Sequence, residues 1–403
     1  MVRLLIIGCA ALVPGLVQAE VNQQLDWTVD VRAVSSDGEP SELDGGMGAL
    51  RFGSNQQGLR LGLLRLGYRA DLADLVHFDI EAVSYGDHAK NLVDLTEAYA
   101  EVRPLPFHGW RSRLKLGAFY PDISLEDRLA GWRSPYTLSN SAINTWVGEE
   151  IRTIGAQYSL DWLGRQMGHD FDAGVSAGVF SWNEPAGTVL AAQGWNITDR
   201  QSTLFSPYGA IRQTPVPPTT EFYSGFDHAI GFDFGLNANY RGWVELKALH
   251  YDNRADPSAF SADIQQFAWR TKFDSAGVRV TPTDALTVIA QYMNGMTAIS
   301  PGGALNLFNF RSEFALVSYQ HSAERFSLRF DRFDLDQPVA SDADYGIDDG
   351  HAWTLAYQHQ FDQHWNAVLE EVLVVSNNNS RFYIGLPSYA RESQLQLAIR
   401  YEH

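Results

Sequence analysis

The chain alternates apolar and polar residues with a period of two, and the pattern is clearest in residues 392–403. One face of this segment carries Leu395, Leu397, Ile399 and Tyr401, while the other carries Gln394, Gln396, Arg400 and Glu402. Successive side chains of a β-strand point to opposite faces, whereas helical spacing would scatter both sets around a cylinder. A strand that meets lipid on one side and water on the other needs this alternation. The pattern therefore predicts a membrane-spanning β-barrel whose last strand closes the sheet.

The same alternation recurs along the rest of the chain. We expect sixteen strands, one of them (277–294) interpreted as a strand that contains a turn. They are 23–34, 58–69, 74–85, 92–103, 111–120, 149–161, 171–181, 225–239, 242–252, 263–275, 277–294, 309–321, 325–335, 350–361, 365–376 and 392–403. The fold class is thus all-β, a transmembrane antiparallel barrel of about sixteen strands.

The lengths of the connections support an even-numbered barrel. In a bacterial barrel the odd-to-even connections lie outside the cell and tolerate length, while the even-to-odd connections are short periplasmic turns. The long connections expected here all follow odd strands: 34–57, 121–148, 182–224, 295–308, 336–349 and 377–391. The short ones all follow even strands: 70–73, 104–110, 240–241, 321–324 and 362–365. A single barrel domain accounts for this parity better than two domains of ordinary length.

The N-terminal residues predict export. Arg3 gives a positive start, residues 4–17 a short apolar core, and Val17-Gln18-Ala19 a small-residue pattern before a cut at Glu20. We therefore expect a signal peptide at 1–19, a mature domain at 20–403, and a location in the outer membrane of a Gram-negative bacterium. A lipoprotein signal around Cys9 is the alternative, but only residues 2–5 would precede it as an apolar stretch.

Composition excludes several classes of function. Cys9 is the only cysteine, and its loss with the signal would exclude thiolate zinc sites and cysteine nucleophiles. Beyond residue 20 no apolar run approaches the roughly 18 residues of a spanning helix. The formal charge of −18 argues against nucleic acid as a partner. Lipopolysaccharide would meet such a surface through divalent cations, which is an expectation for outer-membrane proteins in general.

Three motifs with catalytic or metal-binding associations have simpler explanations. Gly174-Val-Ser176-Ala-Gly178 matches the nucleophile pattern G-x-S-x-G, but it lies inside an alternating strand with no helical pattern after it. His351, His359 and His364 are spread over a strand and a turn. Asp342, Asp344, Asp348 and Asp349 crowd one loop without the spacing of an EF-hand. We expect no metal site, no cofactor and no catalytic residue.

The region with functional content is 93–152. Charged side chains alternate with apolar ones along two neighbouring strands there, and charges facing lipid would cost about 2–4 kcal/mol at mid-membrane, so these rows should face a watery lumen. The long segment 121–148 that follows is rich in aromatic residues and is poorly suited to open water, so we expect it to fold into the barrel mouth. The candidate residues of the pore lining and constriction are Glu97, Glu101, Arg103, Arg113, Lys115, Glu126, Asp127, Arg128, Glu149, Glu150 and Arg152.

The chain resembles the bacterial porin superfamily over nearly all of its expected mature length. Leu114-Lys-Leu-Gly-Ala-Phe-Tyr-Pro121, preceded by Glu97-Ala-Tyr99, is similar to the strand-to-third-loop passage of the phosphate-selective porin-like group. That group has a lumen lined by arginine and lysine and usually closes with phenylalanine or tryptophan. This chain has four lysines and ends in His403. We therefore take the barrel and the channel, and not phosphate selectivity, as the expectation from the resemblance.

Together these observations predict a porin: a water-filled channel for passive diffusion of small hydrophilic solutes or ions, with 121–148 as its constriction. The resemblance also implies recognition of the C-terminal strand by the barrel-assembly machinery and a homotrimer as the assembly to test. Two alternatives stay open, an outer-membrane barrel hydrolase and a closed structural or adhesive barrel. If 121–148 folds inward, Glu126 and Asp127 should oppose Arg103, Arg113 and Lys115 and set up a transverse field at the narrowest point. We expect a preference for cations, because the carboxylates near this basic cluster outnumber it: Glu97, Glu101, Glu149 and Glu150.

Overall fold

The computed structural model of the chain shows one closed antiparallel barrel of sixteen strands. It describes residues 21–41, 44–86, 91–206, 208–209, 221–222, 224–339 and 347–403, so the expected signal peptide lies outside the described residues. The barrel strands are β1 (Val21–Ser36), β2 (Gly58–Leu72), β3 (Val76–Ser84), β4 (Asp94–Val102), β5 (Trp110–Phe119), β6 (Thr153–Trp162), β7 (Phe171–Ser181), β10 (Gly231–Tyr240), β11 (Val244–Asp252), β14 (Arg270–Thr283), β15 (Leu286–Ile299), β16 (Asn306–His321), β17 (Glu324–Val339), β18 (Asp348–Gln360), β19 (Trp365–Asn378) and β20 (Tyr389–Glu402). The predicted fold class is confirmed.

The remaining elements are short. Two small hairpins lie in the connections, β8 (Tyr208–Gly209) with β9 (Glu221–Phe222) and β12 (Phe260–Ser261) with β13 (Gln266–Phe267). The helical segments are α1 (Ala142–Glu150), η2 (Gly164–Met167), α2 (Thr188–Gln193), η3 (Pro301–Gly303) and η4 (Asn379–Ile384). No helix within the described ranges is both long and apolar enough to span a membrane.

The first and last strands close the barrel. β1 pairs with β20 from Thr28–Glu402 to Ser36–Gln394. Trp27 stacks on Tyr401 with ring centroids 4.7 Å apart, and the Trp27 N–H donates to the carbonyl of His403 at 3.2 Å. Leu395, Leu397 and Ile399 remain 45%, 46% and 41% exposed on the outer face, whereas Gln394 and Gln396 are buried inside. The period-two pattern therefore sorts residues between the two faces as the sequence indicated.

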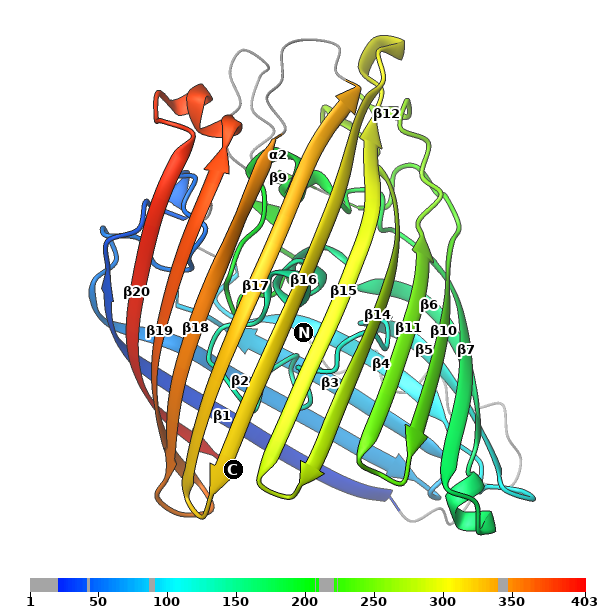
Figure 1. Cartoon of the computed structure of the whole chain (residues 1–403). Coiled ribbons are helices and arrows are strands. Elements are labelled where there is room, and N and C mark those ends of the chain that lie inside the picture. The colour runs from blue at the N-terminus through cyan, green and yellow to red at the C-terminus, as the bar shows by residue number, and fades with distance from the viewer. Residues whose placement is uncertain are drawn as a thin grey trace, which may run out of the picture.

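Long and short connections lie at opposite ends of the barrel (Figure 1). Even-numbered barrel strands are followed by connections of two to eight residues, such as 322–323 after β16 and 163–170 after β6, and every connection of nine residues or more follows an odd-numbered strand. The expected long connection 295–308 is only 300–305, because β15 and β16 extend into it. Strands β14 to β20 have 13 to 16 residues, while β3 to β11 have 9 to 11. The parity deduced from the sequence is confirmed.

The expected strand boundaries are wrong at three places. The segments 263–275 and 277–294 are β14 and β15, and their turn lies at 284–285 and not near Gly277. Residues 225–230 precede β10, which begins at Gly231. Residues 149–150 belong to α1, and β6 begins only at Thr153. At the first of these places, packing explains why a glycine lies in the middle of a strand. A side chain at Gly277 would lie 2.7 Å from Leu125, a residue of the loop inside the barrel.

Candidate functional site

The connection between β5 and β6, residues 120–152, lies inside the barrel, where the sequence analysis placed 121–148. We call it the inward loop. It carries α1, whose nine residues are all buried, and Ser141 caps this helix by accepting a hydrogen bond from the Asn144 N–H at 3.3 Å. Figure 1 shows the inward loop crossing the lumen at mid-height, behind strands β15 to β18. The loop therefore determines how much of the lumen stays open.

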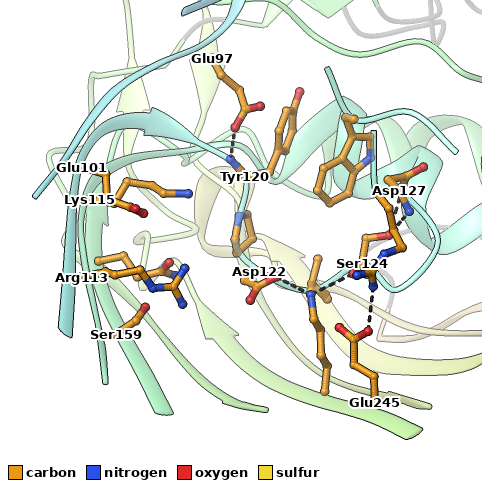
Figure 2. A pocket seen from close by; sticks show the side chains of 16 residues that line it. Glu97, Glu101, Arg113, Lys115, Tyr120, Asp122, Ser124, Asp127, Ser159 and Glu245 are labelled. Atoms are coloured by element: carbon orange, nitrogen blue, oxygen red, sulfur yellow. Dashed lines mark hydrogen bonds and ion pairs between the residues drawn. The ribbon is translucent and has the colours of Figure 1, made fainter. Parts of the chain in front are cut away.

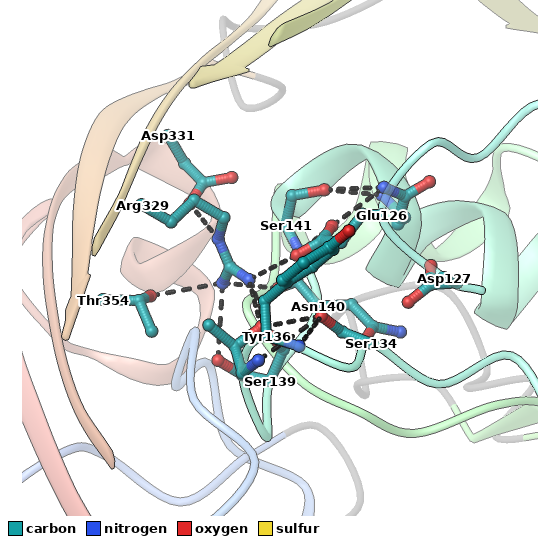
Figure 3. A network of polar contacts seen from close by, with 12 residues as sticks. Glu126, Asp127, Ser134, Tyr136, Ser139, Asn140, Ser141, Arg329, Asp331 and Thr354 are labelled. Atoms are coloured by element: carbon teal, nitrogen blue, oxygen red, sulfur yellow. Dashed lines mark hydrogen bonds and ion pairs between the residues drawn. The ribbon is translucent and has the colours of Figure 1, made fainter. Parts of the chain in front are cut away.

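A fully buried arginine holds the inward loop to the far wall. Arg329 of β17 donates to Glu126 at 2.7 Å, to Asp331 at 2.8 Å, and to the carbonyls of Ser139 and Asn140 at 2.7 and 2.8 Å (Figure 3). Desolvating an ion pair is costly, and such a pair persists when further hydrogen bonds satisfy the remaining donors and acceptors. The guanidinium meets this condition, so it fixes the loop in one position.

Other buried carboxylates bind the loop backbones. Glu370 of β19 accepts from the N–H groups of Leu138 and Ser139 at 2.6 and 3.0 Å, and Asp331 accepts from Ala142 at 3.0 Å. Asp348 of β18 accepts from the Trp195 N–H at 2.8 Å. Backbone N–H groups taken out of water need such partners. The wall of the barrel thus supplies acceptors for the loop segments that enter it.

A second connection, residues 182–206, also enters the lumen, which the sequence analysis did not predict. Its helix α2 contacts the inward loop through Glu150, which accepts from the Val189 and Leu190 N–H groups at 2.9 and 3.2 Å and from the Trp146 indole at 2.6 Å. Burial raises the pKa of Glu150 to about 7, against the opposing effect of these donors. The apolar residues of 186–197 were the sequence signal for this inward position, because apolar side chains are unfavourable in an external loop that is exposed to water.

The two inward segments form an apolar core inside the barrel. Trp146 lies at its centre, with ring centroids 4.9 Å from Phe310, 5.4 Å from Phe273 and 6.0 Å from Trp195. Phe310 and Phe273 are inward residues of β16 and β14. Apolar wall residues pack against the loops on this side, so the watery lumen expected beside the charged rows of β4 and β5 does not extend across the whole barrel.

The opposite side of the lumen is polar and contains a cavity of about 340 Å³ between the inward loop and strands β4, β5, β6 and β11 (Figure 2). Its lining comprises Glu97, Glu101, Arg113, Lys115, Tyr120, Pro121, Asp122, Ile123, Ser124, Asp127, Arg128, Trp132, Gln157, Ser159, Glu245 and Lys247. Nine of these residues carry a charge, five of them negative and four positive. The lining reaches Glu101 and Glu245, close to the short turns. Ligand pockets are about 300–1,000 Å³, so this one suits a small polar solute.

Two ion pairs tie the inward loop to β11 across this cavity. Arg128 of the loop donates to Glu245 at 2.8 Å, and Lys247 donates to Asp122. Lys247 also donates to the carbonyl of Ser124 at 3.1 Å. Figure 2 shows both contacts beside the loop segment from Tyr120 to Asp127. Charges on this side of the cavity are therefore already paired.

The eleven residues predicted from the sequence form two groups, and one residue, Arg103, belongs to neither. Six line the cavity: Glu97, Glu101, Arg113, Lys115, Asp127 and Arg128. Arg103, just beyond β4, lies 3.7 Å from Glu101 in an ion pair. The other four are buried at contacts of the loops: Glu126 with Arg329, Glu149 with Thr198 at 3.2 Å, Glu150 with α2, and Arg152 with the Ser202 carbonyl at 2.6 Å.

The expected opposition of Glu126 to Arg113 and Lys115 is wrong, because Glu126 pairs with Arg329 on the other wall. Arg113 pairs instead with Asp161 of β6 at 3.0 Å. Asp127 keeps an incomplete set of partners: it accepts from Ser124 at 3.2 Å, and its other oxygen is buried without a donor from the part of the chain that the structure describes. Burial, together with the charge of Glu126, raises the pKa of Asp127 well above its usual range.

Sequence reasoning missed Glu245 and Lys247 of β11 as lining residues. Their signal was present, because Val244-Glu-Leu-Lys-Ala248 alternates like the rows on β4 and β5. It also missed Asp122, which the loop presents to Lys247. The partner of a loop residue depends on where the loop crosses the lumen, and periodicity carries no information on that.

The structure also places the three motifs that have catalytic or metal-binding associations. Gly174, Ser176 and Gly178 lie within β7, and a side chain at either glycine would lie 2.2 Å from the carboxylate of Asp161 or Asp233. The histidines bind separate partners, His359 at 2.7 Å from Glu324 and His364 at 2.8 Å from the Glu402 carbonyl. Asp342 and Asp344 lie outside the described residues. Across the described ranges, no three His, Cys, Asp or Glu side chains form a group that could hold a metal ion.

Comparisons with known proteins agree on the barrel. No protein-family model matches the chain, and no curated protein sequence does. Solved structures match over nearly the whole chain. OmpF of Salmonella typhi, in complex with daunomycin, is 9% identical, with 94% of this chain and 97% of that chain covered and a TM-score of 0.55. OmpT expressed in the outer membrane of Vibrio cholerae is 7% identical, with 95% and 98% covered and a TM-score of 0.53.

The trimer form of in-vitro folded OmpT from Vibrio cholerae is 8% identical, with 95% of this chain and 99% of that chain covered and a TM-score of 0.52. What these matches share with the chain is the fold. Two of the three descriptions call their protein one of the outer membrane, and all three matches cover at least 94% of this chain. The fold predicted from alternation and parity is the fold found.

Proposed function

We propose that this protein is an outer-membrane channel through which small hydrophilic solutes or ions diffuse passively. The observation that carries the proposal is the charged cavity of about 340 Å³ between the inward loop and strands β4, β5, β6 and β11. A polar, charge-lined conduit beside an inserted loop is how a barrel of this size selects small solutes. The outward residues support a lipid environment, since Leu236, Leu328 and Leu397 are 49%, 46% and 46% exposed.

The apolar core on the other side of the lumen bears on the size of the channel. Because Trp146, Phe273 and Phe310 pack there, solute has to pass along the polar wall. We therefore propose a narrow channel, with the inward loop as its constriction. Passive diffusion needs no catalytic residue and no cofactor, so the proposal includes neither. A cleaved signal peptide, contact with lipopolysaccharide, recognition by the assembly machinery and a homotrimer remain predictions from the sequence.

Planar-bilayer recordings of refolded protein test the proposal. We expect stepwise currents of small conductance from protein whose heat-modifiable gel shift shows a folded barrel. Folded protein that inserts but gives no steps would overturn the channel. Hydrolysis of a lipid or peptide substrate in that case would favour a barrel hydrolase. Absence of both activities would favour a closed structural barrel, for which the apolar core in the lumen is the supporting observation.

A further inference from the structure

The wall of the cavity formed by β4 and β5 carries charges that the protein itself leaves incompletely paired. Lys115 forms no ion pair with any residue in the described part of the chain. Its ammonium lies 4.4 Å from the ring centroid of Tyr99 and 5.2 Å from that of Phe119. An ammonium over an aromatic face keeps free hydrogen-bond donors, because the ring accepts charge but few hydrogen bonds.

The carboxylates of the same wall are also incompletely used. One Glu97 oxygen accepts from the Tyr120 N–H at 3.2 Å. Among the described residues Glu101 has an ion pair only with the exposed Arg103, at 3.7 Å, and it lies opposite Lys115 in the register of β4 and β5. These carboxylates and the Lys115 ammonium therefore face one cavity without forming an ion pair with one another.

Arg113 provides a further free donor on this wall. Its terminal nitrogen binds Asp161 at 3.0 Å, and Arg111 shares the same carboxylate at 3.2 Å. The Arg113 side chain lines the cavity and remains 30% exposed, so its guanidinium can donate to a ligand carboxylate while it holds Asp161. On the far side of the cavity both cationic side chains already have carboxylate partners: Arg128 pairs with Glu245, and Lys247 pairs with Asp122.

We infer that the β4–β5 wall binds a small zwitterion of the α-amino-acid class. The ligand's ammonium would lie between Glu97 and Glu101, and its carboxylate would accept from Lys115 and Arg113. The mixed wall decides the class. A simple anion would face the carboxylates of Glu97 and Glu101, a simple cation would face Lys115, and a neutral sugar would leave both sets of charges incompletely paired. The inference deepens the proposed function by naming a solute class for the channel.

Ligand binding to refolded protein in detergent tests the inference without any need for conductance. L-Alanine is the probe, and propionate and ethylamine are its two half-molecules, each of which lacks one charged group. Saturation-transfer NMR suits the weak affinity of so small a solute. We expect alanine to bind about tenfold more tightly than either half-molecule, because only alanine satisfies both sets of charges. Equal affinity for all three would overturn the inference.

Paired variants assign the two ends of the ligand. Glu97→Gln combined with Glu101→Gln should weaken alanine and ethylamine about tenfold and leave propionate unchanged or tighter. Lys115→Gln should weaken alanine and propionate and spare ethylamine. Lys272→Gln is the matched control, because Lys272 of β14 is exposed on the outer face. The heat-modifiable gel shift checks that each variant is folded. Loss of alanine binding in the control variant to the same degree would overturn the assignment.

Recordings on the same preparations separate this inference from the proposed function. Conductance steps without preferential binding of alanine would overturn the amino-acid site and leave the channel intact. Preferential binding that follows the variants, in protein without conductance steps, would support the site and overturn the channel. Alanine that also interrupts the current in wild-type protein, but not in Lys115→Gln, would place the site in the conducting path.

Discussion

Arg329 of β17 and Glu126 of the inward loop are joined by a 2.7 Å ion pair, and both side chains are fully inaccessible to solvent. The two residues are 203 positions apart in the sequence and come from opposite sides of the barrel. The pair determines where the loop crosses the lumen. It therefore also determines on which side the polar cavity remains.

Replacing Arg329 should release the inward loop. In Arg329→Met, Glu126 and Asp331 would be left buried without their cation, which typically costs about 3–5 kcal/mol. We expect a lower temperature for the loss of the heat-modifiable gel shift and a larger, noisier single-channel conductance. Arg332→Met is the control, since Arg332 of β17 is exposed on the outer face and forms no ion pair within the described ranges. An unchanged conductance in a destabilised Arg329→Met would show that the loop does not constrict the channel.

Trp146 should stabilise the position of the inward loop as much as the ion pair between Arg329 and Glu126 does, but through packing alone. Trp146→Ala removes the ring at the centre of the lumen core, and truncating a buried aromatic residue costs about 3–5 kcal/mol. We expect both a lower unfolding temperature and a conductance above that of the wild type. Trp353→Ala is the matched change on the outer face, where Trp353 is 46% exposed. If both variants conduct like the wild type, the core does not border the path.

The contact between Glu150 and α2 should weaken as pH rises. The pKa of Glu150 is about 7 in the folded protein and about 4.5 when the chain is unfolded, so the folded state favours the protonated form. The stabilisation is complete below pH 4.5, declines between pH 4.5 and 7, and is absent above that. The protection factors of the Val189 and Leu190 N–H groups, which are corrected for the intrinsic pH dependence of exchange, should therefore fall over this window. Glu150→Gln should remove this fall, and protection factors that rise with pH would contradict the assignment.

The sequence predicts the barrel well because lipid imposes a simple rule on each strand. The outward residues must be apolar whatever the neighbours are, so alternation survives in residues such as Leu395, Leu397 and Ile399. Loop parity adds topology without any reference to tertiary contacts. Both signals are local, and both gave the correct strand number and closure.

The interior could be predicted only in part, because it depends on contacts between distant segments. The expected boundary between two strands lay at residue 276, but the neighbouring Gly277 is a mid-strand residue of β14 that makes room for Leu125. Glu149 and Glu150 were expected on a strand, yet Ser141 begins a helix that carries both of them away from the basic wall. Capping residues were the available signal for that helix. No signal in the sequence could have predicted the pairing of Glu126 with Arg329.

The last prediction concerns ion selectivity, which the cavity should set. Five carboxylates and four cationic groups line it, so the local excess is one negative charge when every group is ionised. The overall charge of −18 acts in the same direction, but it is screened beyond about 8 Å at physiological salt. We therefore expect reversal potentials under a salt gradient to show a mild cation preference. Glu97→Gln with Glu101→Gln should reverse it, while Glu313→Gln with Asp349→Asn on the exposed outer face should not. Anion preference in the wild type that disappears in Arg113→Gln with Lys115→Gln would show instead that the basic residues of β5 govern passage.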